Sequence, residues 1–391
     1  MRLFHEGGTS KVKVFRNKVI VVGKSHHNAL GIIRSLGEFG CEVFLIIISE
    51  RKSFVTKSRY VKKFWQINSG QQVIDLLLEE FRDETERPII IPADDYSASI
   101  IDGNLHMLDE KFVVPNIGNE QCAIVDKMDK TTMNELAEKH GFLVPKSLVL
   151  NLGEVEEINS YVENMDIKYP CIVKPLQSIE GSKSVITVCE NQDVLISILN
   201  KLKPTYKRIL IQEFIEKEGE FGIQGFADHQ NNRVIIPGLI IKLRQSTVAP
   251  GSTTYGKLVK AHPLIDLAKI AELVRDLEYT GIFDIELIHA DGKIYFIEMN
   301  FRNGAYGYAF TRAGVNLPVL WCLSALGRDI SDMSTKVTHE VLLMNETADF
   351  RNVLEKKMGL LSWVRQFLKA DVHLVCNKHD FRPFVHKLLG K

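Results

Sequence analysis

Two short segments near residue 290 alternate apolar and polar positions, as β-strands with one buried face do. The first runs from Phe283 to Ile288 and the second from Lys293 to Asn300. Asp291-Gly292 stands between them, and this dipeptide between two alternating segments is a strong signal for a tight turn. The pattern therefore predicts a β-hairpin.

One face of this hairpin is expected to gather oxygen ligands. Glu298 and Asn300 are two residues apart and so share a face of their strand. Glu286 joins them only if it pairs opposite Glu298, whereas a plain two-residue turn would place it opposite Ile297. The pairing therefore requires an odd loop or a β-bulge. With no basic residue expected between them, two carboxylates and an amide suit Mg²⁺, and the alternative is an ordinary solvated strand face.

The N-terminal third of the chain alternates short apolar runs with amphipathic segments. This order predicts an open parallel α/β domain over residues 1–119. Asp94-Asp95 follows the last apolar run, at the strand end where such sheets present ligand-binding groups. No G-x-G-x-x-G sequence is present, which argues against a nicotinamide dinucleotide site. The predicted strands and helices cover residues 18–23, 28–39, 41–48, 71–81 and 88–92.

Composition narrows the class of protein. The 391 residues are 45% hydrophobic, enough for two or three lobes, and 49 basic residues balance 49 acidic ones. A balanced charge gives no general attraction to nucleic acid. The N-terminus lacks an apolar signal core, and the longest apolar run, residues 43–48, is too short to span a bilayer. Six scattered cysteines predict reduced, buried thiols in a cytoplasmic protein.

The middle of the chain predicts further strands and two helices. A loop of small residues with one lysine, Gly181-Ser182-Lys183-Ser184, lies between two of these strands. Its backbone N–H groups could cradle phosphate oxygens, or the loop could be a plain turn, and it lacks the Walker pattern. The predicted strands cover residues 171–175, 185–189, 209–215, 221–227 and 233–243, and the helices residues 131–141 and 265–277.

Taken in chain order, these segments resemble the ATP-grasp superfamily. Phe301 stands where that family usually has proline, which affects the local turn rather than the ligands. The matching positions are Asp126-Lys127, Val173-Lys174-Pro175, Gly181 with Ser182, Gln212-Glu213-Phe214-Ile215, Glu220, and the hairpin residues Glu286, Glu298, Asn300 and Arg302.

The resemblance implies an α/β ATP-grasp domain over residues 120–330, behind the N-terminal domain. Within it a small lid lobe would cover about 145–212 and a large metal-binding lobe about 213–330. ATP would be bound by Lys127, Lys174, Gly181, Ser182, Glu213, Phe214, Ile215 and Glu220, and Mg²⁺, or Mn²⁺ in its place, by Glu286, Glu298 and Asn300. Arg302 would hold the reacting carboxylate, and its alternative role is a salt bridge within the hairpin.

The resemblance also implies a reaction, in which a carboxylate takes the γ-phosphate of ATP and an amine attacks the acylphosphate. The segments 313–318 and 380–384 look like the carboxylate–amine ligase branch, with an amino acid as one substrate. Lys242 and Arg244 are candidate contacts for phosphate or a second carboxylate, or else belong to a solvated strand edge. The alternatives are a carbamoyl-phosphate-type or phosphoryl-transferring relative, or a nucleotide-binding regulatory protein without turnover.

The C-terminal extension, residues 331–391, contains an amphipathic stripe. Leu360, Trp363, Val364, Phe367 and Leu368 have helical spacing in a basic tail. We expect this stripe to pack on the main body, and contact with a membrane surface is the less favoured interpretation. The sequence is compatible with a homodimer and with small-molecule carboxylate and amine partners.

Overall fold

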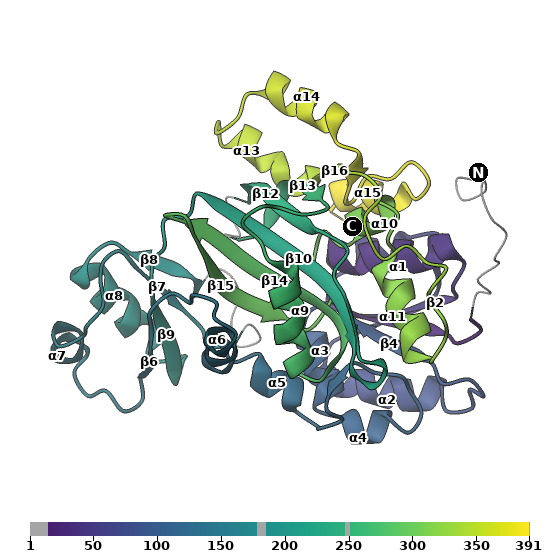
Figure 1. Cartoon of the computed structure of the whole chain (residues 1–391), viewed down its shortest axis with the longest axis horizontal. Helices are drawn as coiled ribbons and strands as arrows, with labels where there is room; N and C mark the ends of the chain where they lie inside the picture. The colour runs from purple at the N-terminus through teal and green to yellow at the C-terminus, as the bar shows by residue number, and fades with distance from the viewer. Residues whose placement is uncertain (1–14, 178–184, 247–250, 391) are drawn as a thin grey trace.

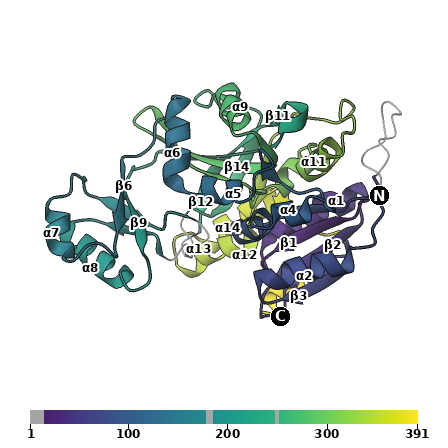
Figure 2. The same ribbon diagram turned by 90° about the horizontal axis from the view of Figure 1, so that it is seen from below.

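The computed structural model describes residues 15–177, 185–246 and 251–390. Their strands form three sheets, one of which belongs to the N-terminal domain, one to a small lobe and one to the centre of the molecule. Figure 1 shows the small lobe, with α7 and α8, standing out from the large central sheet, and Figure 2 shows the N-terminal helices and strands on the other side. The molecule therefore consists of an N-terminal domain, a small lobe and a central sheet.

The N-terminal sheet is parallel, as predicted, with strand order β3-β2-β1-β4. Helix α1 ends at Gly40, whose φ of 100° is the left-handed conformation that glycine adopts without strain. The strand β3 was not predicted, because its side chains are mostly exposed and weaken the apolar pattern. The elements are β1 (Val19–Gly23), α1 (His27–Phe39), β2 (Val43–Ile48), β3 (Val61–Ile67), α2 (Gly70–Glu80), β4 (Ile89–Pro92), α3 (Asp95–Asp102) and α4 (Leu105–Leu108).

The small lobe is an antiparallel sheet of order β6-β9-β7-β8, covered by two helices. It has a hydrophobic cluster of its own, centred on Leu150, Val173 and Leu199. A separate core allows a lobe to move as a unit. Its elements are β6 (Ser147–Asn151), α7 (Ile158–Glu163), β7 (Cys171–Lys174), β8 (Thr187–Cys189), α8 (Gln192–Leu202) and β9 (Arg208–Glu213), and α5 (Ala123–Lys127) and α6 (Lys130–Lys139) precede it.

The central sheet has nine strands and contains the predicted hairpin at one edge. The expectation of one strand over residues 233–243 is wrong, because Pro237 falls between two separate strands, and proline cannot donate to a sheet ladder. Its elements are β5 (Asn116–Ile117), β10 (Gly219–Asp228), β11 (Arg233–Ile235), β12 (Leu239–Gln245), β13 (Thr253–Val259), β14 (Tyr279–Ala290), β15 (Lys293–Asn300), β16 (Val341–Met344) and β17 (Val372–His373), with helices α9 (Leu267–Asp276), α10 (Tyr308–Arg312) and α11 (Leu317–Ala325).

The hairpin of β14 and β15 confirms the predicted bulge. Asp291 and Gly292 form the two-residue turn with φ of 49° and 70°, and Ala290 pairs with Lys293. The register shifts once, between Glu286 and Leu287, so that Glu286 lies opposite Glu298. A bulge gives one strand an extra residue and thereby moves the ligands into line.

The C-terminal extension confirms the predicted packing only in part. It contains α12 (Glu346–Asp349), α13 (Arg351–Leu354), α14 (Leu360–Lys369) and α15 (Arg382–Leu388), and none of the α14 residues is fully buried. Trp363 and Phe367 stack on each other and on neighbouring rings, but Leu368 is 76% exposed. Within the described ranges, none of the helices combines the length and apolar character that crossing a bilayer requires.

The cysteines are free thiols, and four of the six are buried as expected. Cys122 is exposed and Cys376 half-buried, so the prediction of burial is wrong for these two. Both lie in connecting segments rather than in the strands that bury Cys171 and Cys189.

Candidate active site

A cavity of about 400 Å³ lies where the small lobe, the hairpin and the N-terminal domain meet. Its lining combines apolar and charged side chains. Ile172, Ile186 and Val188 of the small lobe give it an apolar wall, while the hairpin contributes acidic and amide groups. The polar residues in its lining are Asp95, Lys130, Lys174, Gln177, Gln212, Glu213, Lys217, Glu220, Gln245, Glu286, Glu298, Asn300 and Arg302.

The bulge determines which hairpin side chains reach this cavity. Ile297 and Glu298 are consecutive, yet both line it, because the bulge interrupts the alternation of faces. Phe296 and Met299 point into the hydrophobic core instead. Asn300 lies on the cavity side, and its amide Nδ2 donates to Glu298 Oε1 at 3.4 Å. The predicted set of Glu286, Glu298 and Asn300 is thus brought together.

A buried lysine lies between the acidic groups, which corrects the expectation that nothing basic would stand there. The Lys242 ammonium is fully buried, pairs with Glu286 Oε2 at 2.9 Å and also donates to Glu220. Burial alone would lower the pKa of Lys242, but Glu286 and Glu220 raise it above its ordinary value. The amine therefore stays charged and neutralises carboxylates from two different strands.

Lys174 is a second buried cation in the cavity. Its ammonium donates to Gln212 Oε1 at 2.8 Å on the neighbouring strand β9. Burial and the nearby Lys130 lower the pKa of Lys174 to about 8, against the opposing effect of Glu298 and Glu286. Burial removes the water that would otherwise stabilise the charged amine. A bound anion would therefore stabilise the charged form of this lysine strongly.

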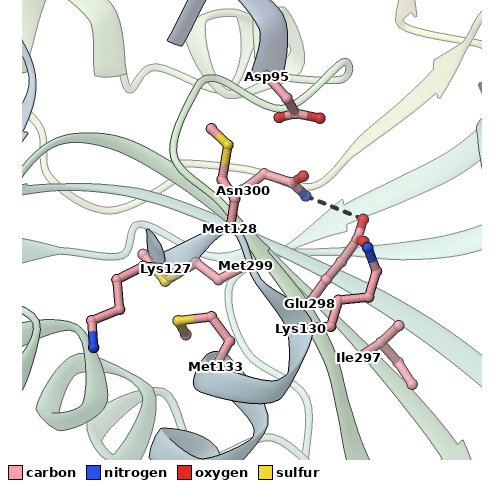
Figure 3. Close-up of a pocket in the computed structure, with 9 residues that line it drawn as sticks. All are labelled: Asp95, Lys127, Met128, Lys130, Met133, Ile297, Glu298, Met299 and Asn300. Atoms are coloured by element: carbon pink, nitrogen blue, oxygen red, sulfur yellow. Dashed lines mark hydrogen bonds between the residues drawn. The ribbon is translucent and has the colours of Figure 1, made fainter. Parts of the chain in front are cut away.

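Lys130, and not the predicted Lys127, lines the 400 Å³ cavity. Both follow an aspartate, and the two Asp-Lys pairs are three residues apart. Lys130 begins α6, lines the 400 Å³ cavity and donates to the Leu176 carbonyl at 3.1 Å. Lys127 lines only a small adjoining recess, where Figure 3 shows its amine directed away from Glu298 and Asn300 while the Lys130 amine lies beside Glu298.

Four more of the residues predicted to bind ATP line the cavity. Glu213 ends β9, and Phe214 and Ile215 follow it in the chain. Glu220 is 5% exposed and accepts from Lys217, Lys242 and Gln245. Although burial raises the pKa of Glu220, Lys242 and Lys217 lower it below its ordinary value, so it is ionised. Gly181 and Ser182 lie outside the described residues.

Arg302 joins the hairpin to the N-terminal domain. Its Nε donates to Asp95 Oδ1 at 3.0 Å, and its Nη1 lies 3.5 Å from Asp284 Oδ2. Burial lowers the pKa of Arg302, but Asp95, Asp284 and Glu298 outweigh it and raise the value. Tyr306 donates to Asp284, which in turn contacts the arginine. The alternative of a salt bridge is therefore observed, although one partner comes from another domain.

Asp284 was not singled out from the sequence, although the alternation that placed Glu286 also places it. It pairs opposite Asn300 and is 2% exposed. Burial raises the pKa of Asp284, while Arg302 and Tyr306 oppose the shift. Phe301, at the position expected for proline, is fully buried and packs edge-on against Tyr279, so it anchors the segment between Asn300 and Arg302.

Arg244 does not line the cavity. Its guanidinium makes a bidentate pair with the buried Asp349, at 2.7 and 2.6 Å, and reaches Gln366 at 2.9 Å. A bidentate arginine–carboxylate pair of this kind is a strong structural contact. Arg244 therefore attaches the C-terminal extension to β12, while Lys242, two residues earlier, faces the cavity side of the sheet with Glu220 and Glu286.

The chemistry of the hairpin donors fits a hard divalent cation. Glu286, Glu298 and Asn300 offer carboxylate and amide oxygens, which Mg²⁺ prefers. Within the described part of the chain, no group of three or more His, Cys, Asp or Glu side chains has metal-binding geometry, and the third member of the predicted set is an amide. Such an incomplete protein shell is typical of magnesium sites that also bind phosphates.

Comparison with known proteins agrees with this geometry. Residues 127–305 match the ATP-grasp domain. Among curated relatives, the D-aspartate ligase of Enterococcus faecium is 23% identical over 266 residues, 63% of this chain and 61% of that protein. The C-terminal section of the carbamoyl phosphate synthase large chain of Methanopyrus kandleri is 27% identical over 219 residues, 54% of this chain and 39% of that protein. The chain thus spans less than two thirds of these relatives.

Solved structures share the fold at low sequence identity. The L-amino acid ligase from Bacillus licheniformis has a TM-score of 0.62 and 15% identity, covering 84% of this chain and 80% of that one. N5-carboxyaminoimidazole synthetase from Staphylococcus aureus in complex with ADP has a TM-score of 0.65 and 16% identity, covering 88% and 86%. Residues 127–305 thus match an ATP-grasp domain, which follows a parallel α/β domain and contributes most of the cavity described above.

Proposed function

We propose that this protein is an ATP-dependent carboxylate–amine ligase with an amino acid as one substrate. The observation that carries the proposal is the register of the hairpin, which places Glu286 opposite Glu298 in a cavity that Lys130 and Lys174 also line. The resemblance to D-aspartate ligase and to an L-amino acid ligase structure supports the same class of reaction.

The residues divide the task as follows. The apolar wall and Phe214 suit adenine, Glu220 suits the ribose hydroxyls, and Lys130 and Lys174 suit the phosphates. We assign the nucleotide role to Lys130 rather than Lys127, because only Lys130 lines the cavity. Glu286, Glu298 and Asn300 would hold Mg²⁺, which supplies charge neutralisation for the phosphates when bound.

Arg302 would position the carboxylate that receives the γ-phosphate. Its guanidinium is already oriented by Asp95 and Asp284, so little ordering remains when the substrate binds. The acylphosphate formed in this way is open to attack by an amine, which forms the amide and releases phosphate. Phosphoryl transfer requires mainly positioning and charge stabilisation, and the cavity provides both.

The identity of the activated carboxylate is tested by measuring ADP release over a panel of D- and L-amino acids and other carboxylates, bicarbonate included. Hydroxylamine should trap an acylphosphate as a hydroxamate with MgATP and the donor alone. Release with bicarbonate only would indicate a carbamoyl-phosphate-type enzyme instead. Nucleotide binding without release of ADP for any donor would indicate a regulatory protein.

The metal site is tested by Glu298→Gln, which keeps the shape of the side chain and removes its charge. We expect activity to fall by at least about 10²-fold, the scale of losing one electrostatic contact to the transition state. Glu272→Gln, at an exposed position of α9, is the matched control and should keep full activity. If both variants are equally active, Glu298 does not belong to the metal site.

A further inference from the structure

Helix α14 has one broad apolar face, and the structure covers only part of it. Trp363 packs edge-on against Phe350 with ring centres 5.0 Å apart, and Phe367 lies 4.2 Å from the His373 ring. At the neighbouring edge of this face, Leu361 is 87% exposed and Leu368 is 76% exposed. Because residues seven apart lie on the same face of a helix, these two leucines project together into solvent.

The exposed face extends beyond the helix. Leu354, at the end of α13, is 68% exposed and Leu360 is 54% exposed. Figure 1 shows α13 and α14 at the outer edge of the molecule, away from the small lobe. The face is also preformed, because Gln366 contacts Arg244 at 2.9 Å and the aromatic residues hold the helix in place. A preformed helix binds without first having to be ordered.

The charges around this face are mostly positive. Residues 351–369 contain five basic side chains and a single acidic one, in a chain whose total charge is balanced. All five basic side chains, those of Arg351, Lys356, Lys357, Arg365 and Lys369, are exposed. Projecting leucines beside exposed cations match an anionic lipid surface, where apolar side chains enter the headgroup region and cations meet the phosphates.

We propose that α13 and α14 attach this protein to anionic membrane surfaces. A second copy of the chain is a poorer occupant, because two such basic faces would repel each other. A ten-residue helix also offers less area than a stable dimer interface requires. The inference does not depend on the proposed ligase activity, since the face lies outside the catalytic cavity.

The test is co-sedimentation of the full chain with phosphatidylcholine vesicles that contain or lack phosphatidylglycerol. We expect binding to the anionic vesicles only, weakened by salt. Leu361→Gln with Leu368→Gln should lower the binding at least about tenfold, as expected when two leucines no longer enter the lipid. Arg365→Gln with Lys369→Gln should weaken the preference for anionic lipid.

The matched control is Met107→Gln with Leu264→Gln, which changes two exposed apolar side chains elsewhere and should leave binding unchanged. A thermal shift with MgATP equal to that of the wild type checks that each variant is folded. Absence of wild-type binding to anionic vesicles, or equal binding by the leucine variant, would overturn the proposal. The proposal would also be overturned if light scattering showed that the wild type is a dimer and the leucine variant a monomer, while the wild type bound no vesicles.

Discussion

Lys242 neutralises the acidic side chains of the site while no ligand is bound. Its ammonium lies between Glu286 and Glu220, which we assign to the metal and to the ribose, respectively. A buried and a partly buried carboxylate without a partner would be costly, because burial disfavours their charged forms. The lysine supplies the compensating charge while no nucleotide or cation is bound, and it comes from β12, a strand that the sequence pattern associated only with substrate contacts.

Removing this cation should destabilise the protein and make it depend on metal. We expect Lys242→Met to lower the free energy of unfolding by about 3 kcal/mol, the lower end of the cost of breaking a buried pair. Mg²⁺ alone should then raise the melting temperature of the variant more than that of the wild type, because it takes over the compensation. Thermal unfolding with and without Mg²⁺ measures both effects. Equal metal-induced shifts in the two proteins would contradict this role.

Lys174 predicts a pH dependence of nucleotide binding. Its pKa of about 8 means that the amine is charged at pH 7 and mostly neutral at pH 9. The charged form binds the phosphates, so affinity for MgATP should fall by about tenfold between these values, as proton linkage requires. Calorimetric titration at a series of pH values measures this. In Lys174→Arg, whose guanidinium keeps its proton throughout, the decrease should be absent, and an identical decrease there would assign it to another group.

At the scale of elements, the hairpin depends on the strand beside it. β10 pairs with β14 so that Gly222 lies opposite Glu286. A Cβ at Gly222 would overlap the Tyr306 hydroxyl, which donates to Asp284 below Arg302. The glycine is therefore required by a close approach between a strand and a tyrosine, while the turn glycine Gly292 is required by its φ of 70°.

These two glycines make a matched pair for mutation. Gly222→Ala should cost about 2–3 kcal/mol of stability through overpacking, and should reduce activity because Tyr306 and Asp284 are displaced. Gly292→Ala has open space around its new Cβ, so it should cost only about 1 kcal/mol of backbone strain and leave activity intact. Urea unfolding and ADP release distinguish the two. Similar effects of both substitutions on activity would remove the link between β10 and the site.

At the scale of the whole molecule, the site exists only where the small lobe, the central sheet and the N-terminal domain meet. The small lobe contributes Lys174, the central sheet Glu286, and the N-terminal domain Asp95. The N-terminal domain is tied to the hairpin by Asn28, whose side chain exchanges hydrogen bonds of 2.6 Å with Asn303. The small lobe keeps its own hydrophobic cluster and sheet, so it has the greater freedom to adjust around a ligand.

Because the small lobe has the greater freedom to adjust, we expect nucleotide binding to change its amide exchange more than that of the N-terminal domain. MgATP should slow amide hydrogen exchange in β7 and β9, because Ile172, Lys174 and Gln212 line the cavity from these strands. The N-terminal strand β1, which lies away from the nucleotide wall, serves as the internal reference and should change little. Exchange monitored by mass spectrometry at saturating nucleotide provides the measurement. Protection confined to β1, with β7 and β9 unchanged, would place the nucleotide elsewhere.

The sequence by itself determined the features that depend on residues close together in the chain, namely strands, turns and the residues that share a strand face. Alternation placed Glu286, Glu298 and Asn300 on one hairpin face and demanded a bulge, and the apolar runs predicted the parallel N-terminal sheet. These features follow from local periodicity, which a linear pattern records. The same rule failed where local signals were equal or mixed, as with the exposed strand β3.

Only the tertiary structure decided which residues meet from distant parts of the chain. It brought Lys242 between Glu220 and Glu286, paired Asp95 with Arg302, and turned Arg244 toward Asp349. It also distinguished Lys130 from Lys127. The two Asp-Lys pairs are identical in sequence, but only Lys130 lines the 400 Å³ cavity, while Lys127 lines the small recess beside it. Contacts of this kind arise from how lobes and strands are packed, and spacing along the sequence carries no record of that packing.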